Sequence, residues 1–346
     1  MQRTAATPIR AAATLAANPP EAAAAPAGKK ARPPQRRIVR RVVDGVLMLD
    51  KPSGVSSNAA LQAARRLLNA AKAGHTGTLD PMASGLLPLT FGEATKFSQQ
   101  LLDADKCYEA QVRLGICTDS GDADGQVVDI RPVEVDRAQL EQALAQFRGD
   151  IEQLPPMYSA LKRDGRPLYE YARAGIEVER APRAVRIHAL ELLGFDAGAA
   201  SVSLRVACSK GTYIRSLAMD LGVALGCGAH LSGLRRTRVG GFDVDAAVSL
   251  QALEAAAEGG ARDALLAPAD ALVAGFAAVQ LSADEAFALL QGRVLPHPAT
   301  GAEEGAQQLM RAYGPQGFLG LVQCDGGLLK PRRLVATPAP DVTASQ

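Results

Sequence analysis

The sequence predicts an α+β protein with a mixed, mainly antiparallel central sheet, and three observations support this class. Several segments alternate apolar and polar residues with the period of two that marks a half-buried strand. Other segments repeat apolar residues at helical spacing. The two kinds follow one another without the regular strand–helix–strand order that predicts a parallel sheet. With 346 residues, the chain is long enough for about two domains and a substantial core.

The first predicted elements surround an irregular, glycine-rich segment. A short apolar run bounded by turn residues predicts a strand, and Ser57 can cap the helix that follows. The alternation after residue 106 is the clearest strand signal. We therefore expect a strand at 44–50, a helix from Ser57 with Leu61, Ala64, Leu67, Leu68 and Ala71 on one face, a loop at 74–85, a strand at 86–91, a helix from Glu93 that buries Ala94, Phe97, Leu101 and Leu102, a strand at 107–116 and a turn at 122–125.

The second half of the chain repeats the alternation and ends in a small β module. A strand is expected at 201–208, where apolar and polar residues alternate again. The next helix has Ile214, Leu217, Ala218 and Leu221 on its apolar face. From about residue 266 a last region begins, in which a glycine-rich turn at 325–327 joins two short strands at 317–323 and 328–335.

The first 41 residues differ in composition from the rest. They contain nine of the 38 basic and one of the 36 acidic residues, which leaves 29 basic and 35 acidic residues in the remainder. With almost no large apolar side chain to bury, the segment cannot offset the entropy of ordering, and we expect a disordered basic tail over 1–41. A transit peptide is the alternative, because acids are scarce. The acidic remainder must hold any polyanion by local basic clusters.

Composition also excludes some classes of protein. No apolar run reaches the 18 or so residues that a membrane span requires, and no apolar region follows the first charges as in a secretory signal. The five cysteines form no CxxC pair, and their odd number argues against a closed disulfide framework. We therefore expect a cytoplasmic protein without membrane association.

The glycine-rich segment GHTGTLDPMASG, residues 74–85, places a single carboxylate on a pre-shaped turn. Its three glycines permit unusual backbone angles, and Pro81 disfavours helical geometry at Asp80. Spacing alone leaves a structural interpretation open, in which Asp80 bonds neighbouring amides of its own turn. A metal site is poorly supported because His75 is the only nearby ligand type, and the Gly-Lys-Ser/Thr ending of a phosphate-binding loop is missing.

The longer segment GHTGTLDPMASGLLPLTFGEATK resembles the catalytic motif of the TruB family, the tRNA pseudouridine-55 synthases. Further blocks resemble the same family in the same order across roughly residues 44–335, so chance similarity is negligible. These blocks are LDKPSG with SSN, LGICTDSGDADG, FRGDIEQLPPMYSALKRDGRPLYEYARAG, CSKGTYIRSLAMDLG and GAHLSGLRRTRVG.

The resemblance implies a pseudouridine synthase fold and the isomerisation of uridine 55 in the T-loop of tRNA to pseudouridine. The essential carboxylate of the family falls on Asp80. Such a carboxylate can attack C1′ of the ribose or stabilise its charge while the detached uracil turns. Addition to C1′, addition to C6 and a glycal route all remain open. No metal or organic cofactor is implied, because the reaction is redox-neutral.

The other site residues follow from the same resemblance. Arg215 is expected to pair with Asp80, although an ordinary surface arginine near a helix start is the alternative. Tyr108 is expected to stack on the target base and is the candidate for removing the C5 proton, with a core tyrosine as the alternative. Tyr213 and Leu234 are expected to line the same pocket. His75 is expected to fill the space left by a flipped base, unless it bonds its own loop.

Basic residues indicate an RNA footprint. Within 34 residues that contain one acid, Asp220, the sequence has Arg205, Lys210, Arg215, Arg235, Arg236 and Arg238. Lys51, Lys210, Arg235 and Arg236 are the expected RNA contacts besides the pocket residues. Lys330, Arg332 and Arg333 form a second cluster in the C-terminal module, which resembles the PUA-like domain of the family.

The predicted organisation is a tail at 1–41, a catalytic domain at 42–250 and a PUA-like RNA-binding module at 251–340. We expect a monomer that acts on the T-arm of tRNA without a protein partner. Two other functions stay open. A tRNA-folding chaperone would use the same cleft without catalysis, and a nucleoside hydrolase would release free uracil.

Overall fold

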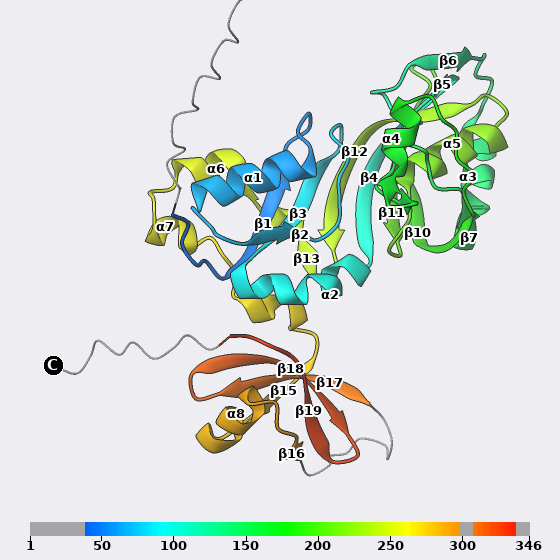
Figure 1. Ribbon diagram of the computed structural model, residues 1–346. Coiled ribbons are helices and arrows are strands. Elements are labelled where there is room, and N and C mark those ends of the chain that lie inside the picture. The colour runs from blue at the N-terminus through cyan, green and yellow to red at the C-terminus, as the bar shows by residue number, and fades with distance from the viewer. Residues whose placement is uncertain (1–38, 298–306, 337–346) are drawn as a thin grey trace, which may run out of the picture. The chain divides into compact units, whose positions relative to one another are not determined.

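The computed structural model describes residues 39–297 and 307–336 (Figure 1). The chain divides into two units, 1–39 and 40–346, and every element below belongs to the second. Most of the expected tail lies outside the described residues. The prediction that the tail extends to residue 41 is corrected. The Arg41 amide donates to the Asn69 carbonyl at 2.9 Å, and the Arg41 guanidinium pairs with Asp263. The ordered backbone therefore begins before residue 42.

A ten-stranded mixed sheet forms the centre of the protein, in the order β14-β1-β3-β12-β4-β11-β10-β7, with β13 beside β12 and β2 beside β3. Only the β1–β14 and β3–β12 pairs are parallel, which confirms the expected mixed, mainly antiparallel sheet. The strands are β1 (Gly45–Lys51), β2 (Ala73–His75), β3 (Ser84–Phe91), β4 (Lys106–Leu114), β7 (Gly149–Gln153), β10 (Arg183–Asp196), β11 (Ser201–Cys208), β12 (Ala229–Val239), β13 (Phe242–Asp243) and β14 (Val248–Ser249).

The parallel pair in the middle of the sheet is short. Strands β3 and β12 share only the partners Ser84–Arg235 and Gly85–Arg236, whereas β12 and β4 pair along most of their length. We call this β3–β12 contact the seam. It lies directly beside the loop that carries Asp80, because that loop leads into β3.

Helices and two small ribbons surround the sheet (Figure 1). They are α1 (Ser57–Leu67), η1 (Gly92–Phe97), α2 (Ser98–Asp103), α3 (Arg137–Ala145), α4 (Leu168–Arg173), α5 (Ile214–Ala224), η2 (Val244–Ala246), α6 (Leu250–Ala255), α7 (Gly260–Asp263) and η3 (Ala269–Val273), with the ribbons β5 (Ile116–Thr118) with β6 (Val127–Ile130) and β8 (Lys162–Arg163) with β9 (Arg166–Pro167). Helix α5 buries its predicted apolar positions, Ile214, Leu217, Ala218 and Leu221.

Three local predictions differ from the structure. The N-cap of α1 is Ser56, and Ser57 instead donates its hydroxyl to the Leu79 carbonyl and accepts from the Leu79 amide, both at 2.8 Å. The helix expected from Glu93 is a 3-10 turn followed by α2, and Leu102 is 37% exposed. Strand β4 ends at Leu114, because Gly115 has a positive φ of 80°.

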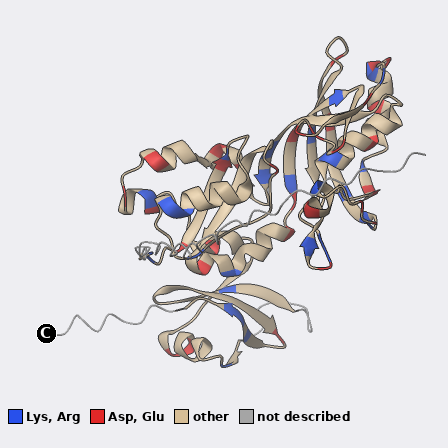
Figure 2. Ribbon diagram, turned by 45° about the horizontal axis from the view of Figure 1, so that its top comes forward, with Lys and Arg blue, Asp and Glu red and all other residues tan. Residues whose placement is uncertain are grey.

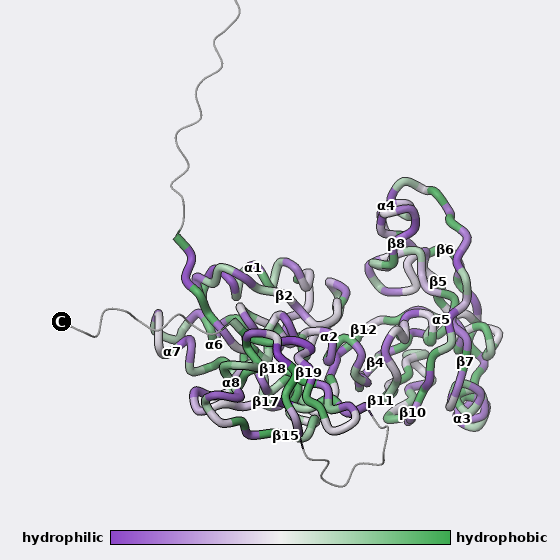
Figure 3. The backbone as a smooth tube through the Cα atoms, turned by 60° about the horizontal axis from the view of Figure 1, so that its bottom comes forward, coloured by the Kyte–Doolittle hydropathy of each residue, from purple (hydrophilic) through white to green (hydrophobic). Residues whose placement is uncertain are grey.

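The C-terminal module has its own five-stranded sheet, in the order β15-β17-β18-β19-β16, with one helix packed against it. The two predicted strands are β18 and β19, and hydrophobic stretches (green) run through the module (Figure 3). Its elements are β15 (Ala277–Gln280), α8 (Ala283–Leu290), β16 (Leu295–Pro296), β17 (Gln308–Gly314), β18 (Gly317–Asp325) and β19 (Leu328–Leu334).

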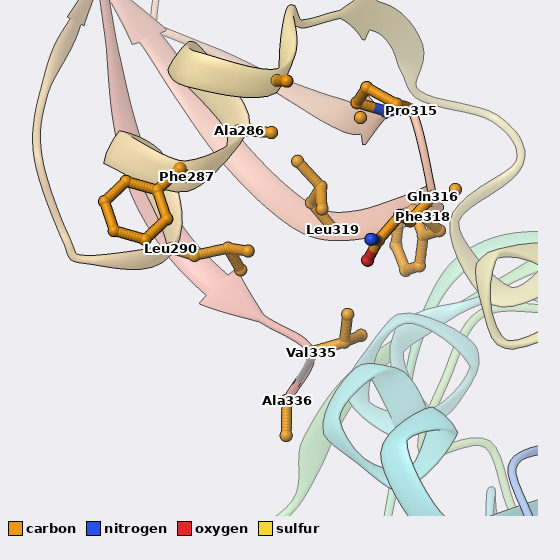
Figure 4. A pocket seen from close by; sticks show the side chains of 12 residues that line it. Ala286, Phe287, Leu290, Pro315, Gln316, Phe318, Leu319, Val335 and Ala336 are labelled. Carbon is orange, nitrogen blue, oxygen red and sulfur yellow. The ribbon is translucent and has the colours of Figure 1, made fainter. Parts of the chain in front are cut away.

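A cavity of about 570 Å³ lies in this module, between α8 and the turn that joins β17 to β18 (Figure 4). Its lining is apolar apart from Gln316 and backbone groups, and it includes Phe287, Leu290, Leu319 and Val335. No charged side chain lines this cavity.

Residues between the main sheet and the module belong with the main sheet. Leu253 of α6 lies in the main core, and Arg262 donates to the Leu67 carbonyl at 2.8 Å. The Val46 and Ala267 backbones also exchange hydrogen bonds. The boundary expected after residue 250 therefore lies later in the chain, before β15. Among the described residues, no helix has the length and apolar character needed to cross a bilayer.

Candidate active site

A cavity of about 350 Å³ surrounds Asp80 and is lined by segments that lie far apart in the sequence. Its lining residues are Gly77–Asp80, Leu102, Lys106, Tyr108, Ser159–Leu161, Ser209, Gly211–Arg215, Leu234 and Arg236. A second cavity of about 460 Å³ adjoins it and shares Thr78, Asp80, Ser159, Ala160 and Arg215. The Asp80 carboxyl group is therefore accessible from two sides.

The turn that presents Asp80 is fixed by the local sequence. Gly77 and Gly85 have φ values of 99° and 100°, which favour glycine. A Cβ atom at Gly85 would lie 2.3 Å from the Arg236 carbonyl oxygen, so the seam also needs glycine there. The Gly54 amide donates to the Pro81 carbonyl at 2.8 Å and ties the turn to the segment after β1.

Lys51 lies beneath this turn. Its side chain is fully buried, and its Nζ donates to the carbonyls of Pro52 at 2.8 Å and Val55 at 2.6 Å. Burial lowers its pKa to about 8, although the nearby Asp80 carboxylate opposes this shift. Because the amine bonds the backbone and does not reach the surface, its position fits support of the turn and not a direct RNA contact.

Asp80 and Arg215 form the expected ion pair. Arg215 Nη2 lies 3.0 Å from Asp80 Oδ2, and the arginine side chain is 5% exposed whereas that of Asp80 is 36% exposed. The guanidinium also donates to the Ser120 carbonyl at 3.1 Å and the Tyr158 carbonyl at 2.6 Å. On its other side, Nε lies 3.5 Å from Asp122 Oδ2. Arg215 is thus held by two loops, that of Ser120 and Asp122 and that of Tyr158, and it pairs with the Asp80 carboxylate.

The electrostatic environment of Asp80 combines opposing effects. Burial raises the pKa of Asp80 above its ordinary value, the positive charge of Arg215 lowers it, and the negative charge of Asp122 raises it again. The pKa remains raised on balance. The carboxylate is therefore less solvated than a surface aspartate, which makes it a stronger partner for a developing positive charge.

Tyr108 lines the cavity from β4, together with the aliphatic Leu234 on β12. Burial raises the pKa of Tyr108, and the charge of Arg236 only partly opposes this shift. The phenol is therefore protonated at neutral pH and poorly suited to accept a proton. Its position in the wall supports the stacking role more directly than the role of a base.

Tyr213 is held in the wall by its backbone. Its amide donates to Gln153 Oε1 at 2.9 Å, and its carbonyl accepts from Gln153 Nε2 at 3.2 Å. Gln153 is 1% exposed, so a buried side chain on β7 fixes the residue that precedes α5. Burial raises the pKa of Tyr213, and the neighbouring Ser159 hydroxyl partly offsets this shift.

His75 ends β2 and does not line either cavity. Its Nδ1 is buried and has no hydrogen-bond partner within the described part of the chain. Burial, with a contribution from Arg236, lowers the pKa of His75, which makes the neutral ring the main form at neutral pH. A neutral ring beside the turn fits stacking on a base better than acid–base work.

The predicted basic cluster is divided between the two faces of the sheet. Arg236 is 2% exposed, lines the cavity and donates to the Leu86 carbonyl at 2.7 Å. The neighbouring Arg235 points to the opposite face and pairs with Asp50 at 2.8 Å. Lys210 lies next to the cavity lining and pairs with Asp103 at 2.8 Å. Over the described chain as a whole, basic residues (blue) and acidic residues (red) are interspersed (Figure 2).

Sequence reasoning missed three residues of the site. Asp122 was assigned to a turn, yet it is 5% exposed and faces Arg215. Lys106 lines the cavity, and its Nζ donates to three carbonyls at the end of α2, with a pKa lowered to about 8 by burial. Ser159 lines both cavities. Only the burial of a charged or polar side chain, which local sequence does not reveal, distinguishes these residues from surface positions.

Three family domains match consecutive parts of the chain. The N-terminal domain of TruB family pseudouridylate synthases matches residues 65–214, and the tRNA pseudouridylate synthase B C-terminal domain matches 215–274. The C-terminal domain of pseudouridine synthase II TruB matches 277–335, starting at the first residue of β15.

Curated relatives and solved structures agree with these matches. The chain is 64% identical to tRNA pseudouridine synthase B of Azoarcus sp. strain BH72, over 88% of this chain and 98% of that protein. It is 65% identical to tRNA pseudouridine synthase B of Aromatoleum aromaticum, over 88% and 97%.

Among solved structures, a chain of a Cbf5-Nop10-Gar1 complex superposes with a TM-score of 0.64 at 28% identity, covering 84% of each chain. A chain of an H/ACA RNP bound to a substrate RNA containing 2′-deoxyuridine superposes with a TM-score of 0.63 at 26% identity, covering 85% of each. The chain, with its mixed sheet and its buried arginine–carboxylate pair, therefore belongs to the TruB family of pseudouridylate synthases and is an isomerase.

Proposed function

We propose that this enzyme converts uridine 55 in the T-loop of tRNA to pseudouridine, with Asp80 as the catalytic carboxylate. The relatives named tRNA pseudouridine synthase B support tRNA as the substrate. The observation that carries the assignment of Asp80 is its ion pair with Arg215 at 3.0 Å, at the junction of two cavities. Asp80 combines partial burial, an arginine partner and a place in the lining of both cavities.

In the proposed reaction, the bond between C1′ and N1 breaks and a bond between C1′ and C5 forms. The proton on C5 is lost and N1 gains one, so the atoms of the nucleotide are conserved apart from exchange with water. While C1′ is electron-deficient, the Asp80 carboxylate either attacks it covalently or stabilises its positive charge. Arg215 aims the carboxylate, because its rigid fork is held by carbonyls and by Asp122.

The lining of the cavity supports one way of binding the base. Tyr108 and Leu234 offer a flat ring and an apolar side chain in the cavity wall, and a base stacked there gains about 1–3 kcal/mol. A uridine inside a folded T-loop cannot reach Asp80 in place, so we propose that it is flipped out of its stack. His75, beside the turn, is proposed to occupy the space it leaves.

The remaining parts of the chain are assigned by the same proposal. The main sheet with its helices is the catalytic domain, and the C-terminal module, with Lys330, Arg332 and Arg333, contacts tRNA outside the T-loop. The enzyme is proposed to act as a cytoplasmic monomer on the T-arm, without a cofactor or an obligate protein partner.

The test is tritium release from a tRNA transcript labelled at C5 of uridine, with the modified position mapped afterwards. Wild-type protein should release tritium and modify the T-loop uridine, and Asp80→Asn should lower the rate at least about a thousand-fold. Asp129→Asn, which changes a surface aspartate paired with Arg131, is the matched control. Retained tRNA binding with no release by wild type would favour the chaperone function, and free uracil would favour a hydrolase.

A further inference from the structure

The second cavity beside Asp80, of about 460 Å³, is used by no step of the proposed reaction. It adjoins the first cavity, because Thr78, Asp80 and Arg215 line both. In an RNA chain, phosphodiester bonds join each nucleotide to a neighbour on either side. Under the proposed function, a target nucleotide at Asp80 in the first cavity therefore has a neighbour within reach of the second.

The two cavities differ in the charge of their lining. The first has one carboxylate, that of Asp80, and the three basic side chains of Lys106, Arg215 and Arg236. The second has two arginines, Arg173 and Arg215, and four carboxylates. These carboxylates belong to Asp80, Asp119, Asp122 and Asp124. The second cavity therefore disfavours a phosphate by like charge and favours a base that donates hydrogen bonds.

Asp124 is the carboxylate of this lining that is left for a ligand. Asp80 and Asp122 already face Arg215, and Asp119 accepts a backbone amide at 2.8 Å. The Asp124 side chain is exposed and makes no ion pair or hydrogen bond within the described part of the chain, while its amide donates to Asp122 Oδ1 at 3.2 Å. A carboxylate on a backbone held in this way can accept hydrogen bonds from the amino group of a base.

Tyr169 and Arg173 supply a stacking platform in the same lining. Both belong to α4 and line the second cavity. Arg173 Cζ lies 5.3 Å from the centroid of the Tyr169 ring, so the two side chains form a cation–π pair. The Tyr169 amide donates to the Ser159 carbonyl at 3.1 Å, which ties the start of α4 to the wall that both cavities share. Aromatic rings and guanidinium planes are surfaces on which proteins stack unpaired RNA bases.

We propose that the second cavity binds the base of a nucleotide next to the target, stacked on the Tyr169–Arg173 pair with its amino group on Asp124, and selects cytosine, adenine or guanine over uracil there. This inference rests on the proposed function, because it takes the position of the target nucleotide from Asp80. Uracil is the disfavoured base, since its ring N–H lies between two carbonyl oxygens that a carboxylate repels.

The first experiment measures kcat/KM for tritium release from T-arm stem-loops labelled at C5 of the target uridine only. One pair of stem-loops has cytidine or uridine directly before the target, and a second pair has them directly after it. Wild type should prefer cytidine at one of these two places. Asp124→Asn should lower that preference about five-fold, because an amide can bond either base. Asp129→Asn, which changes a paired surface aspartate outside both cavities, should keep the wild-type preference.

Two results of this experiment would overturn the inference. One is a wild-type enzyme without a preference for cytidine at either place. The other is a preference that Asp124→Asn leaves unchanged, because the preference would then come from the structure of the RNA loop and not from the cavity.

A second experiment tests the stacking platform with an abasic nucleotide at the preferred place. Tyr169→Leu should lower kcat/KM about ten-fold on the stem-loop with cytidine and leave the abasic substrate nearly unchanged. Tyr171→Leu is the matched control, because Tyr171 lies on the same helix under Arg166, at 4.9 Å, but lines neither cavity. It should keep the wild-type ratio of the two substrates.

Equal losses on both substrates in Tyr169→Leu would contradict stacking in the second cavity. If wild-type protein modifies neither a stem-loop nor a full tRNA, the proposed function itself has failed.

Discussion

Asp122→Asn tests whether the arginine that aims Asp80 depends on a second carboxylate. Asp122 Oδ2 lies 3.5 Å from Arg215 Nε, a separation worth about 5 kcal/mol between unit charges at an effective dielectric constant of about 20. The net loss is smaller, because asparagine keeps an acceptor and Asp80 still balances the charge of Arg215. We expect a loss of about 2 kcal/mol in transition-state stabilisation, or about thirty-fold in the single-turnover rate.

The same substitution has a second, independent effect on pH dependence. The proposed reaction needs ionised Asp80, and on that proposal the rate falls as pH falls through the raised pKa of Asp80. The negative charge of Asp122 contributes to that raised pKa, and its removal lowers the pKa of Asp80. The acid limb of the rate profile should therefore move to lower pH while the plateau drops.

Single-turnover tritium release from pH 4.5 to 8.5, with Asp129→Asn as the control, measures the plateau and the limb together. A plateau equal to that of wild type would refute the argument that Asp122 holds Arg215. A limb that moves to higher pH would refute the sign of its effect on Asp80.

Two further predictions concern the seam and the basic residues. Gly85→Ala should destabilise the fold by about 2 kcal/mol or more, because its φ is 100° and the new Cβ would meet the Arg236 carbonyl oxygen at 2.3 Å. In urea unfolding, Gly241→Ala, which meets no atom within 4 Å, should stay within about 0.5 kcal/mol of wild type. Arg236→Ala should lower tritium release about ten-fold or more, since it leaves the Leu86 carbonyl unpaired and opens the cavity wall. Arg235→Ala removes only a half-exposed pair on the opposite face and should lower it less than about three-fold, so equal losses would contradict the assignment of faces.

Sequence periodicity predicted the elements that carry the site better than it predicted the site itself. The alternation in β4 and the apolar face of α5 follow from burial on one side, and both are present in the structure. The resemblance to the family supplied the Asp80–Arg215 pair, which no spacing rule relates because the two residues are far apart in the chain.

Other features could not be predicted because they depend on tertiary contacts. Ser56 and Ser57 are equally good helix caps in sequence, and only the Leu79 backbone, brought close by folding, decides between them. The run Arg235-Arg236 resembles one basic patch, but a strand sends neighbouring side chains to opposite faces. Asp122 lies in a turn-forming sequence that is normally solvated, and its burial comes from packing against Arg215.

Under the proposed function, a bound substrate helps to hold together the two halves of the sheet that meet at the seam. Strands β3 and β12 share two residue pairs, so backbone hydrogen bonds contribute little to joining the two halves of the sheet. Side chains supply much of the connection, because Arg236 reaches the Leu86 carbonyl and Arg215 reaches Asp80 across it. Under the proposed function, a nucleotide between Asp80 and Tyr108 would bridge the same two halves, and a ligand that binds only the folded state stabilises that state by mass action. The RNA is then a removable cross-link between the two halves, and the proposed reaction takes place where few backbone hydrogen bonds join them.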